Sequence, residues 1–552
     1  MAASRERGRS LGDGMVEQLS ALAPQPIRPE TESGRLARII HFPMRWEATH
    51  AFGLAAAMAL TAIAVLGLGL RLWHVNSMGY NSDEAVYAGQ GAALAGDPEL
   101  TRFFPIIRAH PMLFQFLVSV AFQFGVNDLY ARLLSVAFGI ATIFVVAKLG
   151  QVLYGRWVGV SAALLLAVMP YHVIVTRQVL LDGPMVFFTT LTLFLVAKYA
   201  TTQRPIFLMA TGASLGLVFL AKETGFVMAA GVYAFLALSP QIRIRIRDLV
   251  VSVFCLLLIM AAYPISLSLA GGGASSKARG YAVWQLFRRP NHTLDFYPTL
   301  VPPAIGILVI VAAFLGLWLL RRERSWRETL LLTWIAVPIV VFQLWPVKGF
   351  QYLLPMAPAL AVLAARTFVC WRPNWKGFSL AGRRETFTRA LAIGTVALTL
   401  FIPSWQSVQP STSGNFLAGS GGIPGGRETG EWVRDNVPQD ALFLTIGPSM
   451  ANIIQFYGHR KSYGLSVSTN PLHRNPSYEA VRNPDNLIRN NELQYLVYDS
   501  FSAGRTPFFA KKMMDYVQKY NGRVILEKSV PVTRPDGSVE TKPIIVVYEV
   551  RP

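Results

Sequence analysis

The sequence has few cysteines and a shortage of acidic residues for its length. Only two of its 552 residues are cysteines, Cys255 and Cys370, and both lie in or beside apolar runs. They provide neither a disulfide framework nor the spacing of metal ligands. The 31 acidic residues are outnumbered by 51 lysines and arginines, which gives a net charge of +20. No basic groove or stacking motif accompanies this charge, so nucleic acid is not the expected partner.

The N-terminal segment is not expected to be a short cleavable leader. About fifty polar, arginine-rich residues precede the first apolar run, which does not match the compact start of a signal peptide. The run is therefore expected to remain in place as a signal-anchor helix. Residues 1–50 are expected to form a disordered cytoplasmic tail.

Long apolar runs dominate the rest of the chain. Hydrophobic residues make up 53% of the sequence and the mean hydropathy is +0.39, values that soluble domains rarely reach. The pattern predicts a polytopic α-helical membrane protein with about eleven transmembrane helices, within a range of eleven to thirteen. The expected spans are 51–73, 132–150, 157–175, 183–200, 206–222, 224–239, 249–269, 299–320, 328–346, 351–370 and 388–405.

Arginine-rich loops give the expected orientation. The loops at 243–248, 321–327 and 371–389 are rich in arginine, which favours the cytoplasmic side. All of these loops lie on the same side as the N-terminus if 111–125 does not cross the membrane. This segment has only about fifteen apolar residues, so it is expected to be a juxtamembrane helix. The sequence thus predicts a multi-pass protein of the cell membrane with a cytoplasmic N-terminus and an extracytoplasmic C-terminal domain.

The composition changes after residue 405. A Gly/Ser/Pro-rich linker over 406–425 precedes short apolar runs that alternate with helix-like segments. This alternation predicts an extracytoplasmic α/β domain over 426–552, long enough to bury a core of its own. It contains neither a glycine-rich phosphate loop nor a nucleophile elbow. The spans over 51–405 are expected to form a separate domain with outer loops at 74–110 and 270–298.

Two adjacent acids, Asp83 and Glu84, follow the first apolar run in "MGYNSDEAVYAGQGAAL". A solvated loop is the simplest explanation of this pair. The following "EAVYAGQGAAL" predicts an apolar-faced helix, however, which places the pair near a helix N-terminus. Asp182, in "VLLDGPMVFF", is expected on the same side of the membrane. A helix cap explains Asp182 as well as a site does.

Cations gather on the expected outer side together with these acids. Each of them alone is explained as an interfacial anchor. Together they place several donors around carboxylates, as binding of a lipid phosphate at the membrane surface requires. The candidates are Arg108, His110, Lys222, Arg288, Arg289, His292 and Lys348, with Tyr352 beside the last.

These segments resemble a known family in their order and spacing. The resemblance is carried by "NSDEAVYAGQGAALAGD", "HPMLFQFLVSVAFQFGVNDLYARLLSVAFG", "VTRQVLLDGPMVFF", "ASLGLVFLAKETGF" and "VKGFQYLLPMAPALAVLAAR", over most of 51–370. The chain resembles the GT-C membrane glycosyltransferases, in the branch that holds the protein O-mannosyltransferases and the lipid A aminoarabinose transferase. Enzymes of this kind use polyprenyl-phosphate sugars as donors on the extracytoplasmic side.

The resemblance assigns roles by position. Asp83 matches the catalytic carboxylate of the first outer loop, with Glu84 as its companion, and Asp182 matches a second acid. His110 stands where the aminoarabinose transferase has a phosphate-binding lysine, and Arg108 is a candidate substitute for that lysine. Further phosphate contacts are carried over to the remaining positions: Arg288 or Arg289, Lys348 and Tyr352.

The implied reaction is an inverting glycosyl transfer to a hydroxyl of a protein, a lipid or a cell-envelope glycan. The resemblance implies Asp83 as the general base, with the cations, Lys222 included, stabilising the phosphate that leaves. It requires no cofactor, although three converging carboxylates leave a divalent metal open. The alternatives are a lipid-linked sugar flippase, which would be expected to show internal repeats, and a scaffold for the C-terminal domain.

Overall fold

The computed structural model describes residues 42–105, 110–271, 273–371, 383–410, 423–533 and 538–552. Contacts divide the chain into a short unit, Met1–Ala57, and a long unit, Met58–Pro552. The short unit holds the first part of helix α3 (Phe42–Leu72), so the end of the tail expected over 1–50 is helical. All of the other elements belong to the long unit.

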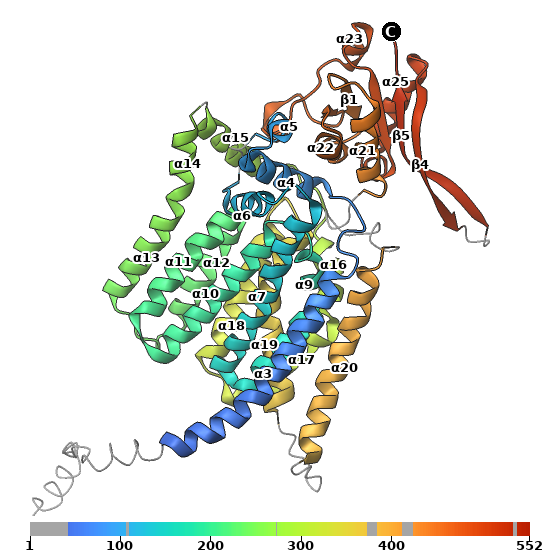
Figure 1. Ribbon diagram of the computed structural model, residues 1–552. Helices are drawn as coiled ribbons and strands as arrows, with labels where there is room; N and C mark the ends of the chain where they lie inside the picture. Colours follow the sequence, from blue (N-terminus) through green and yellow to red (C-terminus); the bar gives the residue numbers. More distant parts are fainter. Residues whose placement is uncertain (1–41, 106–109, 272, 372–382, 411–422, 534–537) are drawn as a thin grey trace, which may run out of the picture. The chain divides into compact units, whose positions relative to one another are not determined.

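The long unit is α-helical up to Ser407 (Figure 1). Its helices after α3 are α4 (Ser82–Ala95), α5 (Pro98–Thr101), α6 (Leu113–Phe122), α7 (Asp128–Tyr154), α8 (Arg156–Ala167), α9 (Pro170–Val175), α10 (Asp182–Thr202), α11 (Pro205–Ala221), η1 (Glu223–Phe226), α12 (Val227–Leu238), α13 (Ile246–Met260), α14 (Ala262–Ala270), α15 (Ala274–Leu286), α16 (Phe296–Ile305), α17 (Ile307–Leu319), η2 (Arg321–Glu323), α18 (Trp326–Leu344), η3 (Phe350–Met356), α19 (Ala357–Cys370) and α20 (Arg383–Ser407).

The expected spans all coincide with apolar helices or helix pairs. Seven spans in the described ranges are long and apolar enough to cross a membrane. The pair α16 and α17 adds an eighth if it forms one span, bent by 89° at Gly306, whose φ of 98° suits glycine. The remaining three expected spans, 157–175, 206–222 and 224–239, contain the shorter apolar helices α8, α11 and α12. The ten-residue helix α6 lies within 111–125. The chain is a multi-pass membrane protein.

Buried charges inside the helical part are satisfied by neighbouring helices. Arg71 of α3 donates to the carbonyl oxygens of Gly67 and Ala167 and to the hydroxyl of Thr176. Arg366 forms an ion pair of 3.2 Å with Glu328, and both side chains are almost fully buried. Because unpaired charge inside a membrane is costly, these contacts fix how the helices pack.

A five-stranded sheet forms the core of the C-terminal part (Figure 1). Its strands lie in the order β2-β1-β3-β5-β4, where β1, β2 and β3 are parallel and β5 is antiparallel to both of its neighbours. The elements are α21 (Gly426–Asn436), β1 (Leu442–Thr445), α22 (Pro448–Gly458), β2 (Lys461–Gly464), η5 (Pro471–His473), α23 (Pro484–Arg489), β3 (Tyr495–Asp499), α24 (Ser500–Arg505), α25 (Pro507–Lys519), β4 (Arg523–Thr533) and β5 (Val539–Glu549).

The sequence predicted this α/β class, and four of the five strands match its apolar runs. Strand β2 was missed because "KSYG" has only four residues and no apolar alternation. Its neighbour β1, by contrast, is formed by "LFLT", whose last three residues are buried. Most of the linker expected over 406–425 lies outside the described residues.

Candidate functional site

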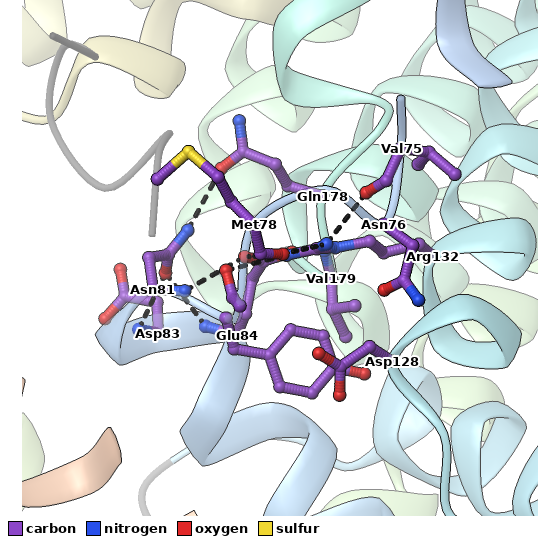
Figure 2. Close-up of polar contacts among 12 residues, drawn as sticks. Val75, Asn76, Met78, Asn81, Asp83, Glu84, Asp128, Arg132, Gln178 and Val179 are labelled. Atoms are coloured by element: carbon purple, nitrogen blue, oxygen red, sulfur yellow. Dashed lines mark hydrogen bonds and ion pairs between the residues drawn. The ribbon is translucent and has the colours of Figure 1, made fainter. Parts of the chain in front are cut away.

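Helix α4 begins with a capping box that separates two adjacent acids. The Asn81 side chain accepts hydrogen bonds from the backbone N–H groups of Asp83 and Glu84, and the Glu84 carboxylate accepts one from the Asn81 N–H. Successive helical residues point about 100° apart. The two carboxylates therefore leave the first turn in different directions, as Figure 2 shows.

Glu84 points into the protein and is only 1% exposed. Its carboxylate accepts from Arg132 Nε at 3.1 Å and Nη2 at 3.0 Å, and from the Val179 N–H at 2.9 Å. The same guanidinium donates to the carbonyl oxygens of Val75, Met78 and Gly79 (Figure 2). Glu84 is thus fully engaged, and the structure corrects its expected place in the site because it does not line the cavity.

Further polar contacts join the start of α7 to the C-terminal part. Asp128, the first residue of α7, accepts hydrogen bonds from Arg427 Nη2 at 2.7 Å and from the Tyr457 hydroxyl. Tyr457 also accepts from the Tyr80 N–H at 2.8 Å. A Cβ at Gly79 would lie 2.6 Å from the Cβ of Arg427, so only glycine permits this approach. We call this cluster the α4 junction: Tyr80, Glu84, Asp128, Arg132, Arg427 and Tyr457.

Asp83 lines a cavity of about 500 Å³. In the described part of the chain no group donates a hydrogen bond to its carboxylate, which is open to the cavity. The enclosed surroundings raise the pKa of Asp83 by disfavouring the charged form, and the positive charges of Lys222 and His110 oppose part of this effect. A carboxylate without a hydrogen-bond donor among the described residues is available to accept a proton.

Lys222, at the end of α11, lines the same cavity as Asp83. Its ammonium donates to both oxygens of the Asp182 carboxylate at 2.8 Å and lies 4.8 Å from the ring centre of Tyr352. Asp182 is 2% exposed, does not line the cavity and has no side-chain cap bond to its helix. It is therefore neither a cap nor a cavity group, and it holds Lys222 in place.

His110 is held between two further residues of the cavity. Its Nδ1 lies 3.0 Å from the Glu223 carboxylate, and its Nε2 lies 3.1 Å from the Tyr281 hydroxyl. Neither Glu223 nor Tyr281 was singled out from the sequence. The signal for Glu223 was its place beside Lys222, at a break between two apolar segments. Tyr281 lies in the segment expected as the outer loop 270–298, and nothing in its sequence neighbourhood indicated a place in the cavity.

The loop before α16 and the turn before η3 supply further residues that line the cavity. Arg288 lies over the Trp284 ring at 4.4 Å and donates to the Gln285 side chain. The Lys348 ammonium donates to the carbonyl oxygens of Gln343 and Trp345, and its third N–H has no acceptor among the described residues. Burial, with the positive charges of Arg505 and Lys348, lowers the pKa of His292, which favours the neutral ring at pH 7.

Seven of the eleven candidates therefore line one cavity. They are Asp83, His110, Lys222, Arg288, His292, Lys348 and Tyr352. Arg289 is exposed and does not line it, which corrects its assignment, and Arg108 lies outside the described residues. We call the cavity-lining residues from Asn81 to Tyr352 the helical wall. Among the described residues no cluster of three or more His, Cys, Asp or Glu side chains could hold a metal.

The opposite wall comes from the C-terminal part, which the sequence did not place at the site. We call it the sheet wall: Ile423, Pro448, Ser449, Ser466, Val467, Ser468, His473, Arg474, Asn475, Tyr478, Phe501 and Arg505. It contains arginines and hydroxyls but no acid. The helical wall, by contrast, contains the two acids Asp83 and Glu223.

A family model and a curated relative match part of the chain in sequence. Residues 109–267 match the family model for dolichyl-phosphate-mannose-protein mannosyltransferase. An uncharacterised protein of Aquifex aeolicus is 26% identical over 266 residues, which cover 46% of this chain and 52% of that one. The chain is thus matched to about half the length of this relative.

Solved structures extend the similarity to most of the chain. ArnT from Cupriavidus metallidurans has a TM-score of 0.64 at 14% identity, covering 91% of this chain and 98% of that one. A second structure of ArnT, with undecaprenyl phosphate bound, has a TM-score of 0.63 at 15% identity. The oligosaccharyltransferase AglB from Archaeoglobus fulgidus has a TM-score of 0.53 at 13% identity, covering 88% of this chain and 74% of that one. The chain therefore has the fold of these two transferases, in agreement with the fold class that the sequence predicted.

Proposed function

We propose that the protein transfers a sugar from a polyprenyl-phosphate carrier to an acceptor hydroxyl, with inversion at the anomeric carbon. The observation that carries this proposal is the Asp83 carboxylate, which has no hydrogen-bond donor among the described residues and lines a cavity together with Lys222, Arg288 and Lys348. ArnT, which has a similar fold, binds undecaprenyl phosphate. The arginine-rich loops on the expected cytoplasmic side support an extracytoplasmic cavity.

In the proposed reaction, Asp83 accepts the proton of the acceptor hydroxyl as its oxygen attacks the anomeric carbon. A new glycosidic bond forms while the bond from this carbon to the phosphate oxygen breaks, and the polyprenyl phosphate departs with both electrons. The cations of the helical wall stabilise the negative charge that grows on the phosphate. Asp182 and Glu223 position Lys222 and His110 for this task, since each holds one of these side chains by direct contact.

Glu84 has a positioning role in this proposal. Its capping bond and its pair with Arg132 fix the first turn of α4, which carries Asp83 into the cavity. No step requires a metal, because a single phosphate charge can be balanced by the cations present.

The test is transfer from a panel of radiolabelled polyprenyl-phosphate sugars to membrane extracts. We expect the wild type to consume one donor, and Asp83→Asn to lose transfer while remaining folded. Asp515→Asn, which changes an exposed carboxylate on α25, is the matched control and retains full activity. An undiminished rate in Asp83→Asn would exclude Asp83 as the base. A donor that crosses the membrane without being consumed would indicate a flippase.

A further inference from the structure

The sheet wall is built by the carboxyl ends of three parallel strands. Ser449 follows β1, Ser466 and Ser468 follow β2, and Arg505 lies at the end of α24, directly after β3. Strand β1 lies between β2 and β3 in the sheet, so the chain leaves β1 toward β2 on one side and returns to β3 on the other. In open sheets of this kind, ligands bind in the crevice at the carboxyl ends, where the strand order reverses.

This crevice opens into the cavity that contains Asp83. The side chains of Ser449, Ser466, Asn475 and Arg505 therefore face the same space as the proposed base. A displacement reaction needs two binding regions on opposite sides of the reacting carbon, one for the leaving group and one for the attacking group. The helical wall supplies the first, and the sheet wall lies opposite it.

The charges of the two walls differ in a way that indicates the ligand. The donor carries one phosphate, and the helical wall already provides Arg288 and Lys348 for it, besides the paired Lys222. The sheet wall adds Arg474 and Arg505. Neither of them forms an ion pair with a carboxylate in the part of the chain that the structure describes. Positive charge without a partner on the acceptor side is suited to a second anion.

We propose that the carboxyl end of the C-terminal sheet is the acceptor subsite, and that it binds an acceptor with an anionic group, a phosphate or a carboxylate, close to its attacking hydroxyl. Arg474 and Arg505 bind the anion, while Ser449, Ser466 and Asn475 bind neighbouring hydroxyls. This proposal rests on the proposed transfer reaction.

The first experiment measures the charge of the transfer product. The full-length protein in membranes is incubated with the donor that it consumes, and the labelled product is passed over an anion-exchange column. We expect the product to be retained, and a neutral product would overturn the proposal. Phosphatase treatment releases the label from retention if the anion is a terminal phosphate, and reduction of carboxyl groups does so if it is a carboxylate.

The second experiment assigns the anion to the sheet wall. We expect Arg474→Gln with Arg505→Gln to raise the apparent KM for extracted acceptor by about tenfold or more, as the loss of charge-assisted hydrogen bonds predicts, and to leave the KM for donor unchanged. The charge-retaining pair Arg474→Lys with Arg505→Lys restores most of the affinity. Arg434→Gln, at an exposed position of α21 outside the cavity, is the control.

An unchanged acceptor KM, or a raised donor KM instead, would overturn the assignment. Failure of the transfer reaction itself is distinguishable, because the wild type would then consume no donor at all. Both arginines lie on the wall of an open cavity, and thermal unfolding of each variant confirms that the change acts on binding rather than on folding.

Discussion

The cavity and the α4 junction begin at adjacent residues, yet they treat charge in opposite ways. Glu84 has an ion-pair partner and two backbone N–H donors, and its surroundings exclude water. Asp83, one residue earlier, has no hydrogen-bond donor among the described residues and lines the enclosed cavity. A charge that is fully satisfied stabilises one arrangement of the chain, whereas a charge without a partner remains available for chemistry. The comparison therefore supports a positioning role for Glu84 and a reacting role for Asp83 in the proposed transfer.

The largest expected effect is on catalysis at Asp83. We expect Asp83→Asn to lower the transfer rate by about 10²- to 10⁴-fold, the usual contribution of a general base. The enclosed surroundings raise the pKa of this carboxyl, so the neutral amide is expected to leave the unfolding temperature unchanged or to raise it. Rates from radiolabelled donor, together with thermal unfolding in detergent, measure both effects. A large fall in unfolding temperature would show that Asp83 belongs to the satisfied class.

Glu84 is expected to show the opposite pattern. Glu84→Gln leaves the Arg132 guanidinium buried without its counter-charge, and breaking such a pair typically costs about 3–5 kcal/mol of unfolding free energy. The protein is expected to unfold at a markedly lower temperature in a thermal unfolding measurement. The molecules that remain folded are expected to retain transfer activity, because Asp83 is unchanged. Glu428→Gln on exposed α21 is the control and should change the stability by less than about 0.5 kcal/mol.

A smaller effect is expected where the junction reaches the C-terminal part. Tyr457→Phe removes the hydrogen bond to Asp128 and the acceptor for the Tyr80 N–H. Loss of these buried contacts should cost about 1–3 kcal/mol. We expect limited proteolysis to release the C-terminal part at lower protease concentration than in the wild type. Equal protection of Tyr457→Phe and wild type would show that the junction does not hold the sheet wall in place.

The smallest expected effect is a shift in pH dependence. Because the pKa of Asp83 is raised, transfer should decline on acidification at a higher pH than an ordinary aspartate would produce. The same shift means that the folded protein holds this proton more tightly than the unfolded chain does. Asp83 therefore contributes stability at acidic pH that is lost as the pH rises through its raised pKa. A profile of kcat/KM against pH measures the acid limb, and residual activity of Asp83→Asn should lack it.

The sequence predicted the fold class well because apolar length and period are local signals. The expected spans coincide with helices, and helix α25 forms where "FFAKKMMDYVQKY" has an amphipathic pattern. The bend at Gly306 was not predicted, since packing as well as propensity decides how a helix continues after a glycine. The short strand β2 was missed because its neighbours in the sheet, not its own side chains, hold it.

The lining of the cavity was predicted in part. Asp83 and the cations of the helical wall stand out in the sequence because they are unusual polar residues at the ends of apolar runs. The sequence could not separate Asp83 from Glu84, because that distinction depends on Arg132, which lies 48 residues beyond Glu84. It also could not place Arg505 at the cavity, because that requires the sheet to pack over the helices.

The sheet wall has a consequence for how the protein is made. A ribosome adds Arg505 to a chain whose apolar helices have all been completed, since α20 ends at Ser407. The helical wall can therefore enter the membrane well before its counterpart exists. During this interval the nascent protein has Asp83 but no enclosed cavity around it. If the sheet wall is needed for the proposed transfer, a nascent chain that still lacks this wall would not consume the lipid-linked sugar.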